Sequence, residues 1–312
     1  MVSHFCCFLG MSRPNYYRHC RRRQQKELQQ ERILELVHQE RRLQPRIGGR
    51  KLQELIGPQL AREGVHLGRD RFFDFLRERD LLIRRKRRKI QTTDSRHGEP
   101  VYPNRLKDYE LTGAHQAWVS DLTYLQTVEG TLYLSLVTDA YSRKIVGWNL
   151  SPHLDTRGCI RALHQALRQL PEGAAPIHHS DRGCQYASRA YTQILQDHGC
   201  RISMTEQNHC YENAKAERVN GILKHEYELK QKWKTSSQLR HAVGQAIWLY
   251  NGRRPHMSLG YRTPDQVHSD ADPSCADNPP LSRAAQVRTG PRTGSGCRQN
   301  QNPAPECKNG TF

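Results

Sequence analysis

Three acidic residues lie where carboxylates are uncommon. Asp121 is surrounded by strand-forming residues, in Trp-Val-Ser-Asp-Leu-Thr-Tyr, where a buried carboxylate costs free energy unless it has a partner. Asp181 follows the short strand-like segment 177–180, and Glu217 lies 36 positions later in a helix-like segment. Carboxylates from two strands and one helix could converge as oxygen ligands of one or two hard cations such as Mg²⁺. Singly, each is more commonly a turn or edge feature, so the chemistry depends on all three lying together.

The segment from about 113 to 268 contains the elements that must position these acids. It alternates strand-like and helix-like patterns, which is typical of a mixed α/β layer. Residues 128–130 predict a hairpin turn, and Asp155 is a candidate N-cap. The predicted strands are 118–126, 131–139, 144–150, 177–180 and 201–204, and the predicted helices are one beginning at Asp155, 188–197, 213–232 and 238–250.

Residues 1–83 predict a small all-α region. Apolar residues recur at helical spacing in 24–40 and 69–82, and a shorter helix begins at Lys51 after the Gly48-Gly49 break. Short helices with Gly-containing turns and Arg-rich surfaces are compatible with a DNA-binding helix-turn-helix module. A plain helical bundle with a solvated charged face fits the same pattern, so the sequence leaves both interpretations open.

The chain is strongly basic, and the charge is concentrated toward the N-terminus. Its 312 residues carry a formal net charge of +18, and residues 1–107 hold 26 of the 49 Lys and Arg but only 12 of the 31 Asp and Glu. This balance predicts a polyanionic partner, most simply nucleic acid. Residues 84–89 are six consecutive basic residues: Arg84, Arg85, Lys86, Arg87, Arg88 and Lys89. We expect them to contact DNA phosphates, and the alternative is a solvated charge run without a dedicated partner.

The remaining composition divides the chain and excludes several classes of protein. Residues 84–112 are interpreted as a basic linker, 113–268 as the α/β core and 269–312 as a disordered tail poor in aliphatic residues.

No apolar run is long enough to span a membrane, and residues 1–10 lack the features of a signal peptide. The scattered cysteines predict reduced thiols in the cytoplasm. A zinc site built on His178, His179 and Cys184 lacks suitably spaced ligands.

Several motifs together make the chain resemble the OrfB-type transposases of the IS-three family of bacterial insertion sequences. Thirty-five residues separate Asp181 from Glu217, and Lys224 follows the Glu by seven positions, both as in that family. Glu212, where the family usually has Asp, and the segment 218–220 depart from its pattern. The motifs that carry the resemblance are L-G-M-S-R-P-N-Y-Y-R (9–18), W-V-S-D-L-T-Y (118–124), the hairpin 130–148, H-S-D-R-G-C-Q-Y (179–186) and Y-N-G-R-R-P-H-M-S-L-G-Y-R-T-P (250–264).

The resemblance implies a fold and a reaction. The fold is an α/β, RNase H-like five-stranded mixed sheet flanked by helices, preceded by the small all-α region and followed by the tail. Asp121, Asp181 and Glu217 become catalytic residues and ligands of Mg²⁺, or Mn²⁺ as a substitute, with two ions expected. The reaction is 3′-end cleavage of DNA followed by strand transfer, in which Lys224 grips a phosphate. Without the family pattern, Lys224 would be an ordinary surface lysine.

The resemblance also implies partners. These are DNA, both element ends and target, further copies of the chain on that DNA, and a possible OrfA-type product of an upstream frame or a fusion with it. We expect a cytoplasmic protein associated with the nucleoid when it is bound to DNA. Two alternatives remain. One is a decayed transposase that acts as a DNA-binding regulator, and the other is a cellular nuclease of RNase H type.

Overall fold

A five-stranded mixed sheet forms the centre of the core. The computed structural model describes residues 2–83, 102–107, 109–206 and 213–270. The strand order is β3-β2-β1-β4-β5, in which β1 is antiparallel to β2, β2 is antiparallel to β3, and β4 is parallel to both β1 and β5. This agrees with the RNase H-like expectation. The strands are β1 (Ala117–Gln126), β2 (Thr131–Asp139), β3 (Ile145–Ser151), β4 (Ile177–Ser180) and β5 (Arg201–Met204).

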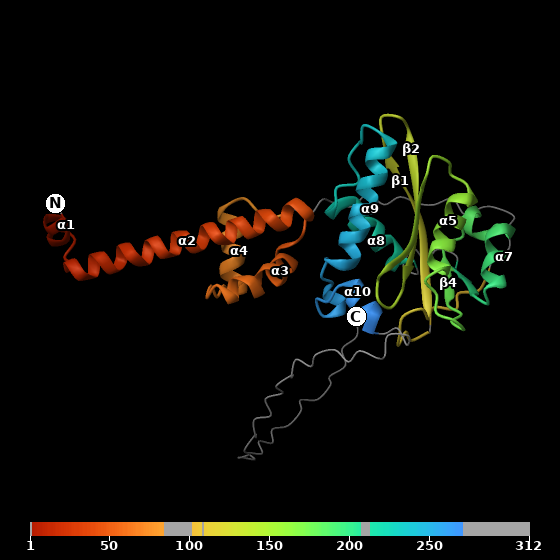
Figure 1. The fold of residues 1–312 in the computed structure, drawn as a ribbon, viewed down its shortest axis with the longest axis horizontal. Helices are drawn as coiled ribbons and strands as arrows, with labels where there is room; N and C mark the ends of the chain where they lie inside the picture. Colours follow the sequence, from red (N-terminus) through yellow and green to blue (C-terminus); the bar gives the residue numbers. More distant parts are fainter. Residues whose placement is uncertain (1, 84–101, 108, 207–212, 271–312) are drawn as a thin grey trace, which may run out of the picture. The chain divides into compact units, whose positions relative to one another are not determined.

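Helices cover both faces of this sheet (Figure 1). One face packs against α5 (Thr156–Leu167), α6 (Cys184–Ala187) and α7 (Arg189–Asp197), through a core that includes Trp118, Leu163 and Tyr191. The other face packs against α8 (Ala214–Glu226) and α9 (Ser236–Gly252). The chain then continues through a 3₁₀ turn (Met257–Leu259) into α10 (Pro264–Asp270).

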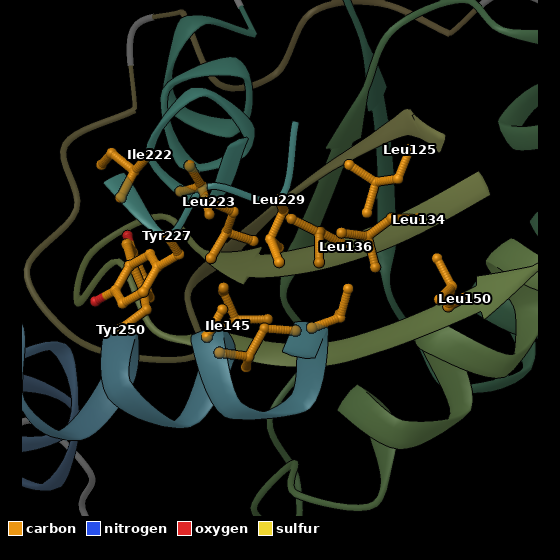
Figure 2. Packing of buried hydrophobic residues seen from close by; sticks show 14 of the residues in the cluster. Leu125, Leu134, Leu136, Ile145, Leu150, Ile222, Leu223, Tyr227, Leu229 and Tyr250 are labelled. Carbon is orange, nitrogen blue, oxygen red and sulfur yellow. The ribbon is translucent and has the colours of Figure 1, made fainter. Parts of the chain in front are cut away.

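The core beneath α8 and α9 fixes the helix that carries Glu217. Figure 2 shows Leu229, which follows α8, between Leu223 of α8 and Leu136 of β2, with Tyr250 of α9 beside Tyr227. Ile222 and Leu223 are 5% and 1% exposed. Burying such side chains contributes about 1.5–3 kcal/mol each, so this apolar contact sets the position of α8 on the sheet.

On the opposite face, the absence of a side chain at Gly147 lets β3 approach α5 closely. A Cβ atom built there would lie 2.1 Å from the carbonyl oxygen of Ala162 and 3.0 Å from the nitrogen of Ala166. Both contacts are with helix backbone, which cannot rotate away. We therefore expect Gly147→Ala to lower the free energy of unfolding by about 3 kcal/mol in urea denaturation.

The matched control is Gly221→Ala, because a Cβ at Gly221 in the interior of α8 meets nothing within 4 Å. That change should raise the free energy of unfolding by up to about 1 kcal/mol through helix propensity. Equal effects of the two substitutions would contradict the close approach of β3 to α5.

The N-terminal region forms helices around a core of its own. Its helices are α1 (Val2–Phe8), α2 (Arg13–Leu43), α3 (Gly49–Arg62) and α4 (Arg69–Glu78). Leu36 and Val37 of α2 pack with Leu52 of α3 and Phe72 and Leu76 of α4. The three predicted helices are therefore present and Gly48-Gly49 separates the first two, but α2 begins well before the predicted residue 24. Whether this region is a helix-turn-helix stays a prediction.

Besides shifts of one or two residues at the ends of other elements, the predictions for the end of α8 and the start of the tail differ from the structure. The helix predicted over 213–232 ends at Glu226, because Glu228 has a φ of +58° and the chain turns back toward the end of α8. Residues 269–270, assigned to the tail, belong to α10. The basic run 84–89 and residues 271–312 lie outside the described residues.

Two further findings concern the chain as a whole. No helix in the described ranges is long and apolar enough to cross a bilayer. Every cysteine within those ranges is a free thiol.

Candidate active site

The register between β1 and β4 brings two of the three acids together. The strands are parallel, with Ala117 opposite Ile177 and Val119 opposite His179. Two residues further along each strand are Asp121 and Asp181, so both carboxylates leave the sheet at the same end. Asp121 is still within β1, whereas Asp181 directly follows β4, as the sequence predicted.

Helix α8 supplies the third acid and two asparagines that tie it to β1. Glu217 lies in its first turn. Asn220 Nδ2 donates to Asp121 Oδ2 at 2.8 Å, and Asn213 Nδ2 donates to the carbonyl oxygen of Ser120 at 3.1 Å. Asn213 is the N-cap residue of α8, but its side chain makes no capping bond and donates to β1 instead. Asn213 and Asn220 lie on either side of Glu217 in the sequence, so these two bonds hold the turn of α8 that carries Glu217 against β1.

The electrostatics of Asp121 show that the three acids act on one another. Burial and the charge of Asp181 raise the pKa of Asp121 from 3.8 to about 7. Glu217 raises it further, while the bonds from Asn220 and from the Leu122 backbone, the latter 2.9 Å from Oδ1, oppose the shift. Crowded negative charges favour the protonated form of one of them. A bound cation would relieve this repulsion.

The raised pKa predicts a pH dependence of stability. The folded state holds the Asp121 proton more tightly than the unfolded state, so this group destabilises the fold as pH rises from about 4 to about 7. The shift corresponds to about 4 kcal/mol, which partial solvent access reduces to about 2. In urea denaturation, Asp121→Asn should therefore be about 2 kcal/mol more stable than the wild type at pH 8. At pH 4 the two should be nearly equal, and a difference that is constant with pH would refute the assignment.

The loop after β4 holds Asp181 by backbone contacts. The backbone N–H of Gly183 donates to Asp181 Oδ1 at 3.1 Å, and a Cβ at Gly183 would lie 3.0 Å from that oxygen. Arg182 Nε donates to the carbonyl oxygen of Thr205 at 2.6 Å, which links this loop to the chain after β5. The glycine of the Asp-Arg-Gly motif therefore allows the carboxylate to fold back onto its own loop.

The two histidines before Asp181 are structural. His178 Nε2 lies 2.8 Å from Ser120 Oγ and 2.9 Å from Tyr191 Oη, and burial lowers the pKa of His178 to about 3. His179 Nδ1 lies 2.9 Å from Ser203 Oγ. His178 therefore connects β4 to β1 and α7, and His179 connects β4 to β5.

Asp139 is also structural. It is fully buried, and its carboxylate accepts bonds from the backbone N–H groups of His115, Tyr141 and Ser142 at 2.7–3.1 Å. The hydroxyl of Ser142 donates to it as well, at 2.8 Å. These bonds hold the turn between β2 and β3, so Asp139 stabilises a strand end.

Lys224 of α8 contacts β1, the strand that carries Asp121. Its Nζ is 4.6 Å from the centre of the Tyr124 ring, and Tyr124 is 42% exposed. Burial lowers the pKa of Lys224, while the charge of Asp121 raises it. The contact with Tyr124 joins Lys224 to this strand.

Asp121, Asp181 and Glu217 offer the type of ligand atom that a divalent cation prefers. Their ligand atoms are all oxygens, which hard cations prefer, and their mutual repulsion favours cation binding. Among the described residues, however, no three His, Cys, Asp or Glu side chains lie close enough together to hold a metal ion as they stand. The three carboxylates would therefore have to draw together on binding it.

Asn220 is the site residue that the sequence analysis missed. It was noted only as part of a departure from a family pattern. Its position three residues after Glu217 places both side chains on one face of α8, and this spacing was the available signal. Which acid Asn220 would contact depended on the packing of α8 against β1.

Family models match the part of the chain that carries the three acids. A family model described as "Integrase core domain" matches residues 112–210, and a second with the same description matches 198–264. The chain is 34% identical over 263 residues to the "Insertion element IS600 uncharacterized 31 kDa protein" of Shigella sonnei, covering 83% of this chain and 95% of that protein.

Other relatives carry functional names. The chain is 32% identical over 210 residues to the "Transposase for insertion sequence element IS629" of Shigella sonnei, covering 67% of this chain and 70% of the relative. It is 35% identical over 196 residues to the "Transposase InsF for insertion sequence IS3A" of Escherichia coli (strain K12), covering 62% and 68%. Among solved structures, the "HTLV-2 integrase catalytic core domain in complex with magnesium (trimeric form)" is 20% identical, with a TM-score of 0.39, covering 49% of this chain and 96% of that one.

Proposed function

The chain belongs to the integrase-core transposases of the IS3 family of bacterial insertion sequences, and on that premise we propose that Asp121, Asp181 and Glu217 are its catalytic carboxylates. Transposases act on DNA, and the proposed reaction is cleavage at the 3′ ends of the element followed by strand transfer into a target. The observation that supports this most is the register of β1 and β4, which sets Asp121 level with Asp181 at one end of the sheet.

The three carboxylates would hold divalent cations, Mg²⁺ or Mn²⁺, and two ions are proposed. Such ions supply activation of an attacking water or 3′-hydroxyl and stabilisation of the leaving oxygen. Asn220 holds the Asp121 carboxylate in place through the bond to Oδ2. Lys224 neutralises a phosphate near the scissile bond, since it lies near Asp121 and carries the opposite charge. Repulsion among the acids couples their deprotonation to cation binding.

The other parts of the chain are proposed to bind and deliver DNA. The helical region 1–83 is proposed to bind element ends and residues 84–112 to link it to the core, which extends from 113 to the end of α10 at Asp270. Within the linker, Arg84–Lys89 would contact phosphates. Several copies of the chain are proposed to assemble on DNA, with or without an OrfA-type partner, in the cytoplasm and at the nucleoid.

Cleavage of labelled DNA tests the proposal. The substrate is a duplex with the element's own end, identified from the DNA that flanks the coding frame, and any upstream-frame product is supplied. With Mg²⁺ or Mn²⁺, the chain should nick at the element end and join it to a target. With Ca²⁺ it should bind with little or no turnover, because the looser coordination does not align the reacting oxygens. Specific binding without cleavage under every metal would favour the regulator alternative.

A further inference from the structure

The segment that follows α8 is basic and is held firmly against the sheet. Three of its residues, Lys230, Lys232 and Lys234, are exposed. Glu228 is the one acid between Tyr227 and Thr235. The segment therefore presents a net positive charge at the surface immediately after the helix that carries Glu217.

Backbone bonds attach this segment to the β1–β2 hairpin. The Trp233 N–H donates to the carbonyl oxygen of Gln126 at 3.0 Å, and the Val128 N–H donates to the carbonyl oxygen of Trp233 at 2.8 Å. Thr127 and Trp233 form a parallel bridge. At the other end of the segment, Leu229 is 1% exposed in the core beneath α8. These contacts reduce the entropy that the lysine backbone would lose on binding a ligand.

The same contacts bring the segment next to Tyr124 and Lys224. The backbone N–H of Lys230 donates to the carbonyl oxygen of Lys224 at 3.2 Å, and the charge of Lys230 lowers the pKa of Lys224. Tyr124 belongs to β1, two residues before Gln126, and its ring faces the Lys224 ammonium. Because the Tyr124 ring is 42% exposed, a DNA base can stack on it, and the Lys224 ammonium can contact a neighbouring phosphate.

We propose that Tyr124, Lys224, Lys230, Lys232 and Lys234 form one DNA-contact surface beside the acidic site. The lysines bind successive phosphates of one strand, and the Tyr124 ring stacks on a base next to the scissile phosphate. Cationic side chains that follow a backbone, together with an exposed aromatic ring, are what a nucleic-acid strand requires. This inference rests on the proposed function, because it assigns the strand that the acids would cut.

Binding to DNA of arbitrary sequence tests the lysines without any cleavage. The variant K230A/K232A/K234A is compared with R161A/R168A/R189A, which removes the same charge from exposed positions on α5 and α7, across the sheet from α8. With a short labelled duplex, the lysine variant should bind about tenfold or more weakly, and its slope of log affinity against log salt should flatten by about two to three units. The arginine variant should change the slope by less than about one unit.

Fluorescence and cleavage test the tyrosine. In an element-end duplex, 2-aminopurine replaces the base next to the cleavage position. The full chain and Tyr124→Phe should quench it by stacking, and Tyr124→Ala should not. Loss of one stacking contact should reduce cleavage about 5- to 100-fold in the Ala variant, with recovery in the Phe variant.

The outcomes separate the two proposals. If the wild type cuts element ends and the lysine variant keeps the wild-type affinity and salt slope, the contact surface is refuted. Equal quenching by Tyr124→Ala and the wild type refutes the stacking. If the wild type binds DNA but never cuts it, the proposed function fails, while a flattened slope in the lysine variant still supports the surface as a DNA-binding one.

Discussion

Asp181→Asn and Glu217→Gln are each expected to reduce DNA cleavage and strand transfer by about a thousandfold or more. Both substitutions keep the size of the side chain and remove the negative charge that holds a divalent cation. Binding to element-end DNA should change by less than about threefold, and it should tighten if anything, because a carboxylate near phosphates repels them. The measurements are nicking and joining of labelled element ends with Mg²⁺ and, separately, binding to the same DNA.

Glu206→Gln is the matched control, because it removes one negative charge from the segment just after β5 and outside the proposed trio. It should cleave within about threefold of the wild type. Glu212→Gln serves the same purpose at a position outside the described residues. If Glu217→Gln cuts normally while Glu212→Gln is inactive, the third ligand has been assigned wrongly.

The second large effect concerns a buried ion pair at the far end of α8. Arg254 is 2% exposed, and its Nε and Nη2 donate to the two oxygens of Glu226 at 2.8 and 2.9 Å. Burial raises the pKa of Glu226, but the bonds and charges of Arg254 and Lys51 outweigh it and bring the pKa to about 2. Arg254→Met would leave the partly buried Glu226 carboxylate without the partner that bonds both of its oxygens through a guanidinium, and with Lys51 as the remaining cation. It should lower the free energy of unfolding by about 3–5 kcal/mol in urea denaturation.

A double variant shows whether the loss comes from this pair. Glu226→Gln together with Arg254→Met removes both charges and should be less destabilised than Arg254→Met. Because the folded pKa of Glu226 is depressed, its contribution is present above about pH 4.5 and lost as pH falls toward 2. A double variant whose loss equals the sum of the two single losses, with no dependence on pH, would contradict the pairing.

Local patterns in the sequence determined the elements and the candidate acids. The strand 131–139 and the short strands 177–180 and 201–204 were predicted with the boundaries that the structure has. Asp155 was predicted as an N-cap and accepts a bond from the Gly158 N–H at 3.2 Å. These features depend on residues within a few positions of one another, so the sequence alone contains them. The family resemblance added the spacing that singled out Asp121, Asp181 and Glu217.

Tertiary structure decided what depends on residues far apart in the chain. The end of α8 at Glu226 was mispredicted, because the following residues are drawn to the hairpin by Trp233, more than 100 positions from Gln126. The bond from Asn220 to Asp121 spans 99 positions, and the ring beneath Lys224 comes from β1. Side-chain periodicity specifies which face of an element is buried, but it does not specify which residue of another element will meet it. The packing of α8 across β1 therefore converts three separated acids into one electrostatically coupled site.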